Sequence, residues 1–384
     1  MPSLVTGIRG TADILANRQV IDISDTIHLL EPSSYPLVTF CNSLEKVKPA
    51  HNPVVRWMED ELEPLVDLVN AAHTAATQTL NVDNGTFWRV GDIVHVPRTG
   101  ENMRTTAISS NALTVVRSFG GTAAAALVDD EAVWNLGPAQ REGDTSRALL
   151  STLEVEQSNR TQIIRTPFGT TNTQSATDLY DGNDFDYQAK KAAIEHAVRI
   201  ERFLLFGQNQ SSTVSSQPLR TMSGVLQFIQ TNRLDVNGVL TESEFDAFCE
   251  AGFRYGGADQ KLFVTSGRVI RAVNNFAKEK LQTMQKDDTY GINLTKYRSP
   301  FGDVLLAYHR QFVGNTYAGY GLLLDMDRIV LRPLRGGRSA GSLAVRVTNI
   351  QANDEDSRKD EYLSELTLEF QNEKAHALMT GVQG

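Results

Sequence analysis

The sequence of 384 residues contains only two cysteines, Cys41 and Cys249, which stand far apart in the chain. Such a pair forms neither a disulfide framework nor the closely spaced thiols of a zinc site, so we expect a reducing environment. Each cysteine has an apolar residue beside it in the sequence. We therefore predict that both are small core residues rather than nucleophiles.

Long apolar runs are also lacking. No stretch approaches the ~18 apolar residues that a membrane-spanning helix needs, and Met1 to Gly10 lacks the apolar segment of a signal peptide. We expect neither a membrane span nor secretion. The composition, with 41% hydrophobic and 22% charged residues, is ordinary for a globular protein and excludes a wholly disordered chain.

The common motifs of catalysis and nucleotide binding are absent from the sequence. It has no phosphate-binding loop, no complete glycine-rich dinucleotide motif, no serine-nucleophile elbow and no H-E-x-x-H zinc motif. The seven histidines are scattered along the chain. We therefore predict that the protein is not an enzyme and has no catalytic, cofactor-binding or metal-binding residues.

Two weaker patterns could bind a metal. Glu373 and His376 have E-x-x-H spacing, but metal sites in helix bundles use two such motifs, so we predict a solvated pair. The acidic run Asp354 to Asp356 could attract a divalent cation, although such a run is more typical of a solvated loop.

Basic residues are few and unevenly spread. The chain has 46 acidic and 37 basic side chains, a net charge of −9, and no lysine between Lys48 and Lys190. An acidic total disfavours a dedicated nucleic-acid-binding protein. Arg332, Arg335 and Arg338 surround a turn, which is either a contact for an acidic or phosphate-bearing partner or a solubilising surface.

The first 50 residues are expected to form an extended arm. Their apolar residues follow no sustained period, and Pro32, Pro36 and Pro49 disfavour long helices. Such an arm buries few of its own apolar residues, so it must lie across its own body or a neighbour.

Residues 61–143 differ in composition from the preceding arm, with 10 acidic residues, 5 arginines and no lysine. Short β-like runs recur between turn signals, which predicts a small antiparallel sandwich or barrel. The predicted runs are 87–90, 93–96, 105–108, 113–116 and 132–134. Residues 151–176 follow as two extended, polar runs that predict a two-stranded ribbon, which needs a further strand or a partner for stability.

The strongest helical pattern spans residues 184–206. Asn183 or Asp184 can cap its start, and Gly207 is suited to its end. Glu195 and Arg199 make a favourable pair one turn apart.

The remaining sequence alternates helix and strand. Thr241 and Glu244 predict a capping box for a helix reaching Phe253, and Ser266 is suited to cap a helix extending to Leu281. The predicted strands are 262–265, 304–308, 320–324, 329–331, 345–347 and 366–370. This mixed order predicts an α+β fold.

Several motifs occur in an order typical of one family. They are Asn159-Arg160-Thr161-Gln162-Ile163 in the ribbon, Tyr187-Gln188-x-Lys190 and Glu201-x-x-Leu204-Leu205-x-Gly207 in the helix, and Gly100-Glu101-x-Met103 and Glu142-Gly143 in the β segment. The chain thereby resembles the major capsid proteins of tailed bacteriophages, which have the Hong Kong 97-like fold. It is most similar to a subfamily with an inserted β domain.

This resemblance implies a division of the chain into the parts of that fold. The parts are an N-terminal arm (1–50), an extended loop (51–60 and 144–182), an inserted β domain (61–143), the spine helix and P domain (183–240), the A domain (241–340) and a return to the P domain (341–384). We expect the insert to face outward or to bridge capsomers.

The resemblance also implies a function. Copies of the chain would assemble in the host cytoplasm as pentamers and hexamers of an icosahedral head shell, a part of the virion that encloses double-stranded DNA. The implied partners are a separate scaffolding protein, a portal, a possible decoration protein and, weakly, the packaged DNA, with no membrane and no cofactor. Some relatives crosslink subunits through a lysine of the extended loop, but residues 49–189 contain none, so we expect noncovalent contacts.

The predicted assembly contacts lie on the arm, the ribbon, the helix and the arginine turn. The candidate residues are Arg160, Gln162, Arg165, Phe168, Glu195, Arg199, Arg332, Arg335 and Arg338. Two alternatives remain: another virion structural protein, such as a tail or decoration component, or a polymer-acting hydrolase that uses the β segment as a binding module.

Overall fold

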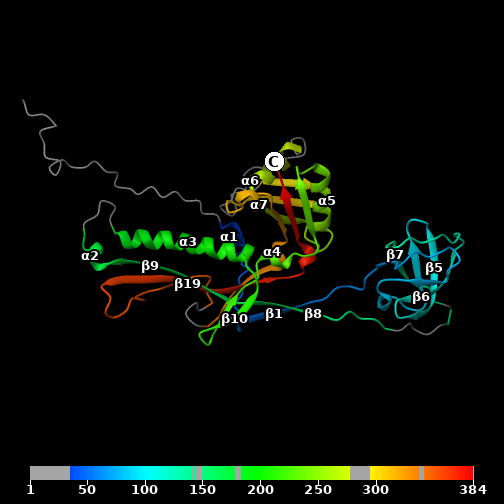
Figure 1. The fold of residues 1–384 in the computed structure, drawn as a ribbon, viewed down its shortest axis with the longest axis horizontal. Coiled ribbons are helices and arrows are strands. Elements are labelled where there is room, and N and C mark those ends of the chain that lie inside the picture. The colour runs from blue at the N-terminus through cyan, green and yellow to red at the C-terminus, as the bar shows by residue number, and fades with distance from the viewer. Residues whose placement is uncertain are drawn as a thin grey trace, which may run out of the picture. The chain divides into compact units, whose positions relative to one another are not determined.

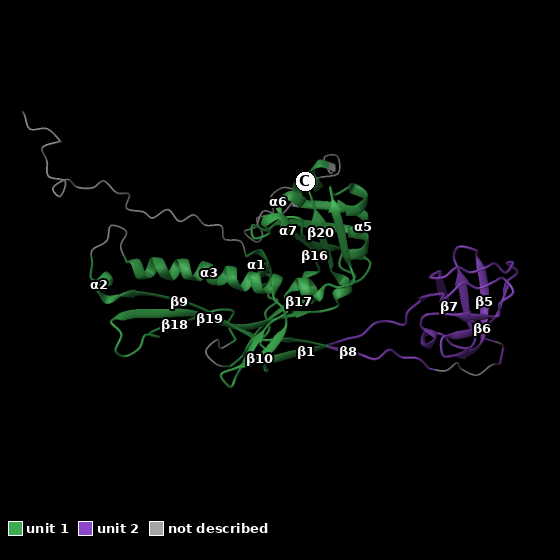
Figure 2. Ribbon diagram, viewed as in Figure 1, with its two compact units in different colours: residues 1–57, 157–384 green, residues 58–156 purple. Residues whose placement is uncertain are grey.

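The computed structural model describes residues 35–140, 142–143, 149–177, 183–276, 295–336 and 341–383. The chain divides into two compact units (Figures 1 and 2). Unit 2 is the continuous segment Met58–Glu156, and unit 1 consists of Met1–Trp57 and Gln157–Gly384. Unit 2 is thus somewhat wider than the predicted insert, and most of the predicted arm lies outside the described residues.

Helix α3 (Asp184–Phe206) in unit 1 confirms the strongest prediction from the sequence. The side chain of Asn183 accepts a hydrogen bond from the Phe185 amide at 3.1 Å, and Asp184 and Asp186 favour the positive end of the helix dipole. At the other end, the Gly207 amide bonds the Phe203 carbonyl at 3.0 Å. A side chain at Gly207 would collide with backbone oxygens.

A sheet packs against α3. Strand β9 (Gln162–Thr171) pairs antiparallel along β19 (Ser357–Phe370), and β19 also pairs with β17 (Ile329–Pro333) and β18 (Val345–Val347). Burial alternates strictly along β9, as expected for a strand with one covered face.

The predicted ribbon of residues 151–176 is wrong. Strand β8 (Val155–Arg160) pairs with β1 (Val54–Glu59), whereas β9 pairs with β19. The polar residues of β9 suggested two wet faces, but Thr166 and Thr170 are buried and hydrogen-bonded. The sequence therefore predicted extended conformation correctly and the strand partners incorrectly.

A second sheet of unit 1 has six strands in the order β12-β20-β16-β13-β15-β14. Their bounds are β12 (Arg233–Gly238), β20 (Ala377–Val382), β16 (Gly321–Leu324), β13 (Gln260–Thr265), β15 (Gly302–Tyr308) and β14 (Thr295–Ser299). The pairs β13–β15 and β12–β20 are parallel and the others antiparallel. This mixed sheet, with helices between its strands, confirms the α+β prediction.

Helices α5 (Glu242–Phe253) and α6 (Gly267–Phe276) connect strands of this sheet. The predicted capping box of Thr241 and Glu244 is present at the start of α5. Ser266 Oγ accepts hydrogen bonds from the amides of Arg268 and Val269 at the start of α6. The predicted continuation to Leu281 lies outside the described residues. The short elements of unit 1 are α2 (Asn172–Ser175), α4 (Val225–Phe228), α7 (Gly314–Tyr317), and the hairpin of β10 (Gln210–Val214) and β11 (Gln217–Thr221).

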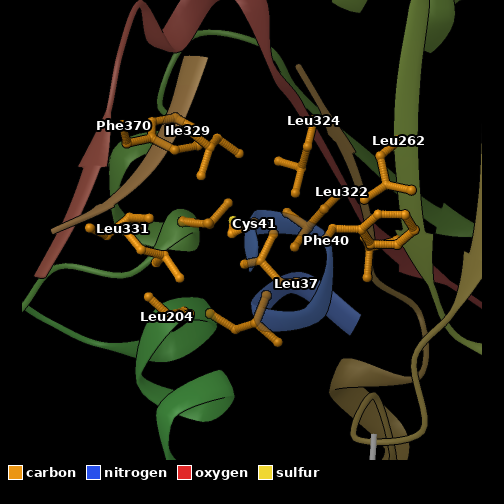
Figure 3. Packing of buried hydrophobic residues seen from close by; sticks show 14 of the residues in the cluster. Leu37, Phe40, Cys41, Leu204, Leu262, Leu322, Leu324, Ile329, Leu331 and Phe370 are labelled. Atoms are coloured by element: carbon orange, nitrogen blue, oxygen red, sulfur yellow. The ribbon is translucent and has the colours of Figure 1, made fainter. Parts of the chain in front are cut away.

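Helix α1 (Pro36–Ser43) belongs to the main core of unit 1. Figure 3 shows its residues Leu37, Phe40 and Cys41 among side chains of α3 and of both sheets. Beyond it, the amides of Lys48 and Ala50 bond the carbonyls of Leu331 and Pro333 at 2.9 and 2.7 Å. The described part of the arm therefore lies across its own body.

Both cysteines are buried, as predicted. Burial raises the pKa of the Cys41 thiol to about 12 and has the same effect on Cys249. Because the thiolate is the reactive species, both are inert core residues.

Unit 2 is a small β barrel. Its six strands are β2 (Val66–Leu68), β3 (Thr79–Asn81), β4 (Asp92–Val96), β5 (Glu101–Ser109), β6 (Ala112–Val116) and β7 (Ala132–Pro138), in the order β2-β7-β4-β5-β6-β3. Every strand pair is antiparallel. Hydrogen bonds from the Asn70 amide to the Asn81 carbonyl (2.8 Å) and from the Asp83 amide to the Leu68 carbonyl (3.0 Å) join the two edge strands. The sheet therefore closes on itself.

One predicted strand of unit 2 is wrong. Residues 85–87 form a short 3-10 helix in place of the start of the predicted strand 87–90. Trp88 then turns inward, and its indole donates a hydrogen bond to Asp67 at 3.0 Å. The run of aromatic and β-branched residues suggested a strand, but in the structure its Trp88 side chain packs inside the barrel.

Candidate assembly surfaces

A buried carboxylate joins three distant segments of unit 1. Glu201 on α3 accepts the backbone amides of Leu37 and Val38, each at 2.9 Å. His309 Nδ1 accepts the Gln311 amide, so its Nε2 carries the proton and donates to Glu201 at 3.0 Å. Helix α1 has no side-chain cap of its own, so Glu201 satisfies its free amides.

A second buried polar chain ties α3 to the sheet. Ser364 Oγ donates to the Leu343 carbonyl, so it accepts from His196 Nε2 at 2.7 Å. His196 Nδ1 then accepts from the Thr166 hydroxyl at 2.9 Å. Burial, and secondarily the positive charge of Arg199, lowers the pKa of His196 to about 4. The imidazole is therefore neutral and works as a structural link.

Of the predicted interface residues on the ribbon, three are engaged within the subunit. Arg160 donates to the Asn209 side chain, and Gln162 is buried and accepts the Met222 amide at 3.1 Å. Phe168 is buried against Phe185, with ring centroids 5.4 Å apart. Only Arg165 is exposed.

The predicted pair on α3 lies at the surface. Glu195 and Arg199 are 3.9 Å apart and each is about half exposed. Arg199 also donates to the hydroxyl of the buried Thr166 at 3.0 Å, which places the arginine beside the helix-facing side of β9.

The three arginines of the predicted turn differ in their exposure to solvent. Arg332 lies 3.3 Å from Glu369 and is mostly covered, whereas Arg335 is exposed. Arg338 lies outside the described residues. Arg335 is thus the one described residue of the three that is open to a partner.

The predicted solvated pair of Glu373 and His376 is wrong. Glu373 accepts the amides of Gln230 and Thr231 at 2.6 and 3.1 Å. His376 is fully buried, which lowers its pKa to about 3. Their E-x-x-H spacing reflects separate structural roles, and the described residues contain no group of three or more side chains placed to hold a metal.

The acidic run is a surface loop, as predicted. Asp354, Glu355 and Asp356 are all exposed. Asp356 accepts a hydrogen bond from the Asn172 side chain, and Glu355 pairs with Lys359. These contacts anchor the loop to the start of α2 and to β19.

Two-stranded elements expose apolar side chains that the sequence did not single out. The hairpin of β10 and β11 exposes Val214 and Leu219, and its turn residues Ser215 and Ser216 have positive φ angles of 48° and 63°. A two-stranded hairpin is marginal in water by itself, and non-glycine residues in this conformation weaken it further. Val155 on β8 is likewise exposed. These elements are suited to contact another molecule.

The charge of the chain is concentrated in unit 2. Residues 58–156 carry 15 acidic side chains, 6 arginines and no lysine, so their net charge of −9 equals that of the whole chain. The remaining residues carry no net charge, with 31 acidic and 31 basic side chains. Among the described residues, no helix has the length and apolar character needed to cross a membrane.

Comparisons with known proteins agree with this architecture. The family model of the SU10 major capsid protein matches residues 6–383. The search of curated proteins returned no relative. The chain is similar in structure to a chain from the capsid of the native GTA particle, with a TM-score of 0.52 and 9% identity over 97% of this chain and 98% of that chain. It is also similar to a chain from Mycobacterium phage Bobi, with a TM-score of 0.50 and 8% identity over 98% and 99%.

At such low identity these structures show the fold alone, a mixed α+β fold of capsid proteins. The family match is the stronger finding because it extends over nearly the whole sequence. This chain belongs to the SU10 major capsid protein family.

Proposed function

We propose that this protein is the subunit of an icosahedral head shell that encloses the double-stranded DNA of a tailed bacteriophage. Its fold would be of the Hong Kong 97-like type, with α3 as the spine helix and the mixed six-stranded sheet in the A domain. The family match supports the capsid role. The shell geometry and its contents are inferred from the resemblance.

The observation that best supports a shell is the exposure of two-stranded elements. Val155, Val214 and Leu219 stand exposed on strands that are paired on one side only. In a shell, neighbouring copies cover such elements, and many modest interfaces add up to a stable particle. We therefore place β1–β8, β10–β11 and the exposed residue Arg165 at subunit contacts.

We infer that these contacts are noncovalent. Residues 49–189 contain no lysine, so the extended loop has no amine that could form an amide crosslink. A separate scaffolding protein would guide assembly, and a portal and a decoration protein are further partners of the proposed shell.

The acidic character of the subunit fits a shell that holds DNA weakly. All of the net charge resides in residues 58–156, which the phosphate backbone repels. We propose that unit 2 faces away from the genome, while the charge-balanced unit 1 forms the shell wall.

Sedimentation velocity tests the proposal. The chain is expressed alone and together with the genes that neighbour its own. Capsomers or particles far larger than the 42.4 kDa chain are expected, with particles favoured by co-expression. A monomer in both samples would overturn the proposal.

A further inference from the structure

A row of four side chains crosses the outer face of the barrel in unit 2. The residues that alternate with them along β7, β4 and β5, such as Val133, Val94 and Met103, are buried in the barrel core. The four side chains therefore point outward, and pairing across the strands makes them neighbours. We call them the Trp134 row. In order they are Val66 on β2, Trp134 on β7, His95 on β4 and Asn102 on β5, each opposite the next.

The polar end of the row presents a free acceptor beside a free donor. Asn102 Oδ1 lies 2.7 Å from His95 Nδ1, so the imidazole donates from Nδ1, and its neutral form leaves Nε2 as an acceptor. The amide group of Asn102 keeps both of its N–H donors. Within the part of the chain that the structure describes, no hydrogen bond occupies His95 Nε2 or Asn102 Nδ2. The bond between the two side chains holds these groups next to each other.

Trp134 supplies an aromatic surface beside this polar pair. It is 46% exposed, whereas Trp57 and Trp88, the other two tryptophans of the chain, are 8% and 4% exposed. The core of the barrel forms without Trp134, so its ring is not needed to fold unit 2. The face of an aromatic ring carries negative potential, which attracts C–H groups that bear a partial positive charge.

The charges around the row disfavour ionic ligands. No carboxylate lies on the outward face of β4, β5 or β7, and Arg104 is the only arginine there. Arg98 and Glu131, which lie just beyond β4 and β7, pair with each other at 2.7 Å. A cation therefore finds no partner on the row, while the net charge of −9 in residues 58–156 repels polyanions such as nucleic acids.

We propose that the Trp134 row binds a neutral saccharide chain. A pyranose ring has a face of C–H groups that fits Trp134. Its adjacent hydroxyls each donate and accept, which suits His95 Nε2 and Asn102 Nδ2. An aromatic surface with a few placed polar groups is typical of a ligand site, and small β barrels of other families bind oligosaccharides on a strand face. A purely apolar partner would leave both polar groups unpaired, which is unfavourable.

The saccharide site goes beyond the proposed shell and does not depend on it. A single site of this kind, open to water, is expected to bind weakly. A shell that carries many copies of unit 2 would bind a surface of repeated sugars far more tightly through multivalency. In the proposed shell unit 2 faces away from the genome, where such a surface is accessible.

Tryptophan fluorescence of the full chain tests the site, because Trp134 is the exposed tryptophan of the three. The probes are neutral hexasaccharides of glucose, of N-acetylglucosamine and of mannose. At least one of them is expected to protect the fluorescence from acrylamide quenching in a saturable way. A hexamer of galacturonate and a single-stranded oligothymidylate are expected to give no protection. Failure of all the neutral probes, or equal protection by either anionic probe, would overturn the proposal.

Calorimetric titration of variants with the protecting hexasaccharide tests the residues. Trp134→Leu is expected to abolish binding, and Asn102→Leu to weaken it about tenfold through lost hydrogen bonds. Tyr255→Leu is the matched control, because it removes an aromatic side chain of unit 1 that is also 46% exposed; it should bind as the unsubstituted chain does. Circular dichroism establishes that each variant is folded. Undiminished binding by folded Trp134→Leu would contradict the inference.

The same quenching measurement on assembled particles tests whether a neighbouring subunit occupies the row instead. Trp134 is expected to remain accessible to acrylamide in particles without saccharide. If Trp134 is shielded there, another copy covers the row, and the proposal is overturned. Absence of any particle would overturn the proposed function and leave saccharide binding by the single chain unaffected, so the two failures are distinguishable.

Discussion

Glu201 and His309, both fully buried, are hydrogen-bonded at 3.0 Å, and the same carboxylate holds the first two free amides of α1. A single side chain of α3 therefore fixes the described end of the arm and the end of β15. These groups come from three segments that are distant in sequence, so their hydrogen bonds hold α1, α3 and the end of β15 together.

We expect Glu201→Gln to destabilise unit 1 by ~1–3 kcal/mol, the cost of leaving a buried polar group without its hydrogen bond. The amide offers one acceptor where two backbone amides and an imidazole need partners. Hydrogen exchange at residues 36–43 should accelerate, since α1 loses its cap. Glu195→Gln is the control on the same helix, because Glu195 is about half exposed. Unaltered exchange in folded Glu201→Gln would show that the carboxylate does not hold the arm.

Acid should weaken unit 1 through His196. Its pKa is about 4 in the folded chain, against 6.5 for an ordinary histidine, so the unfolded state binds the proton more tightly. The contribution of His196 to the free energy of unfolding is therefore fully present above about pH 6.5. It is lost progressively as the pH drops toward 4. Each pKa unit corresponds to about 1.4 kcal/mol, so the loss amounts to a few kcal/mol.

Urea unfolding at pH 7 and pH 4.5 measures this dependence. His196→Gln should reduce the difference between the free energies of unfolding at the two pH values. His51→Gln, which changes an exposed histidine, should leave that difference unchanged. His376, whose burial lowers its pKa to about 3, adds to the same trend in both variants. Equal pH dependence in the two variants would contradict the role assigned to His196.

Unit 2 should depend strongly on the ion pair of Arg117 and Glu101, which lie 2.7 Å apart in the barrel. Burial opposes ionisation of Glu101, but hydrogen bonds from Arg117, Ser118 and Ala125 hold its pKa below the ordinary value. Removing the arginine leaves a buried carboxylate unpaired, so Arg117→Met should cost about 3–5 kcal/mol.

Calorimetry of the full chain measures this effect. We expect the transition of unit 2 to move to lower temperature while that of unit 1 is unchanged. Arg98→Gln removes the half-exposed arginine that pairs with Glu131, and it should have a much smaller effect because solvent screens such a pair. Equal shifts for the two variants would argue against the buried pair as the main support of the barrel.

Mature particles should dissociate completely into single chains in denaturant. With no lysine in residues 49–189, the proposed extended loop lacks the amine for an amide crosslink. Denaturing electrophoresis should therefore give one band near 42.4 kDa. A ladder of covalent oligomers would refute the noncovalent shell.

The sequence was informative where local signals determine structure. Helix α3 was predictable because Asn183, the apolar period and Gly207 all agree, and α5 was predictable from its capping box. The order of motifs was sufficient to indicate the family. These features depend on residues that are near one another in the chain.

Strand partners and buried polar groups were not predictable in the same way. Strand β9 pairs with β19, almost 200 residues later in the chain, and nothing local to β9 indicates this choice. Glu201, His196 and His376 look like surface residues in the sequence, but their partners from distant elements make burial possible.

Negative-stain electron microscopy of the purified protein, alone and co-expressed with its neighbouring genes, tests the central claim most directly. The account predicts rings of five or six subunits, or closed shells of uniform size, with the shells abundant after co-expression. Dispersed single subunits in both preparations would contradict an assembly function.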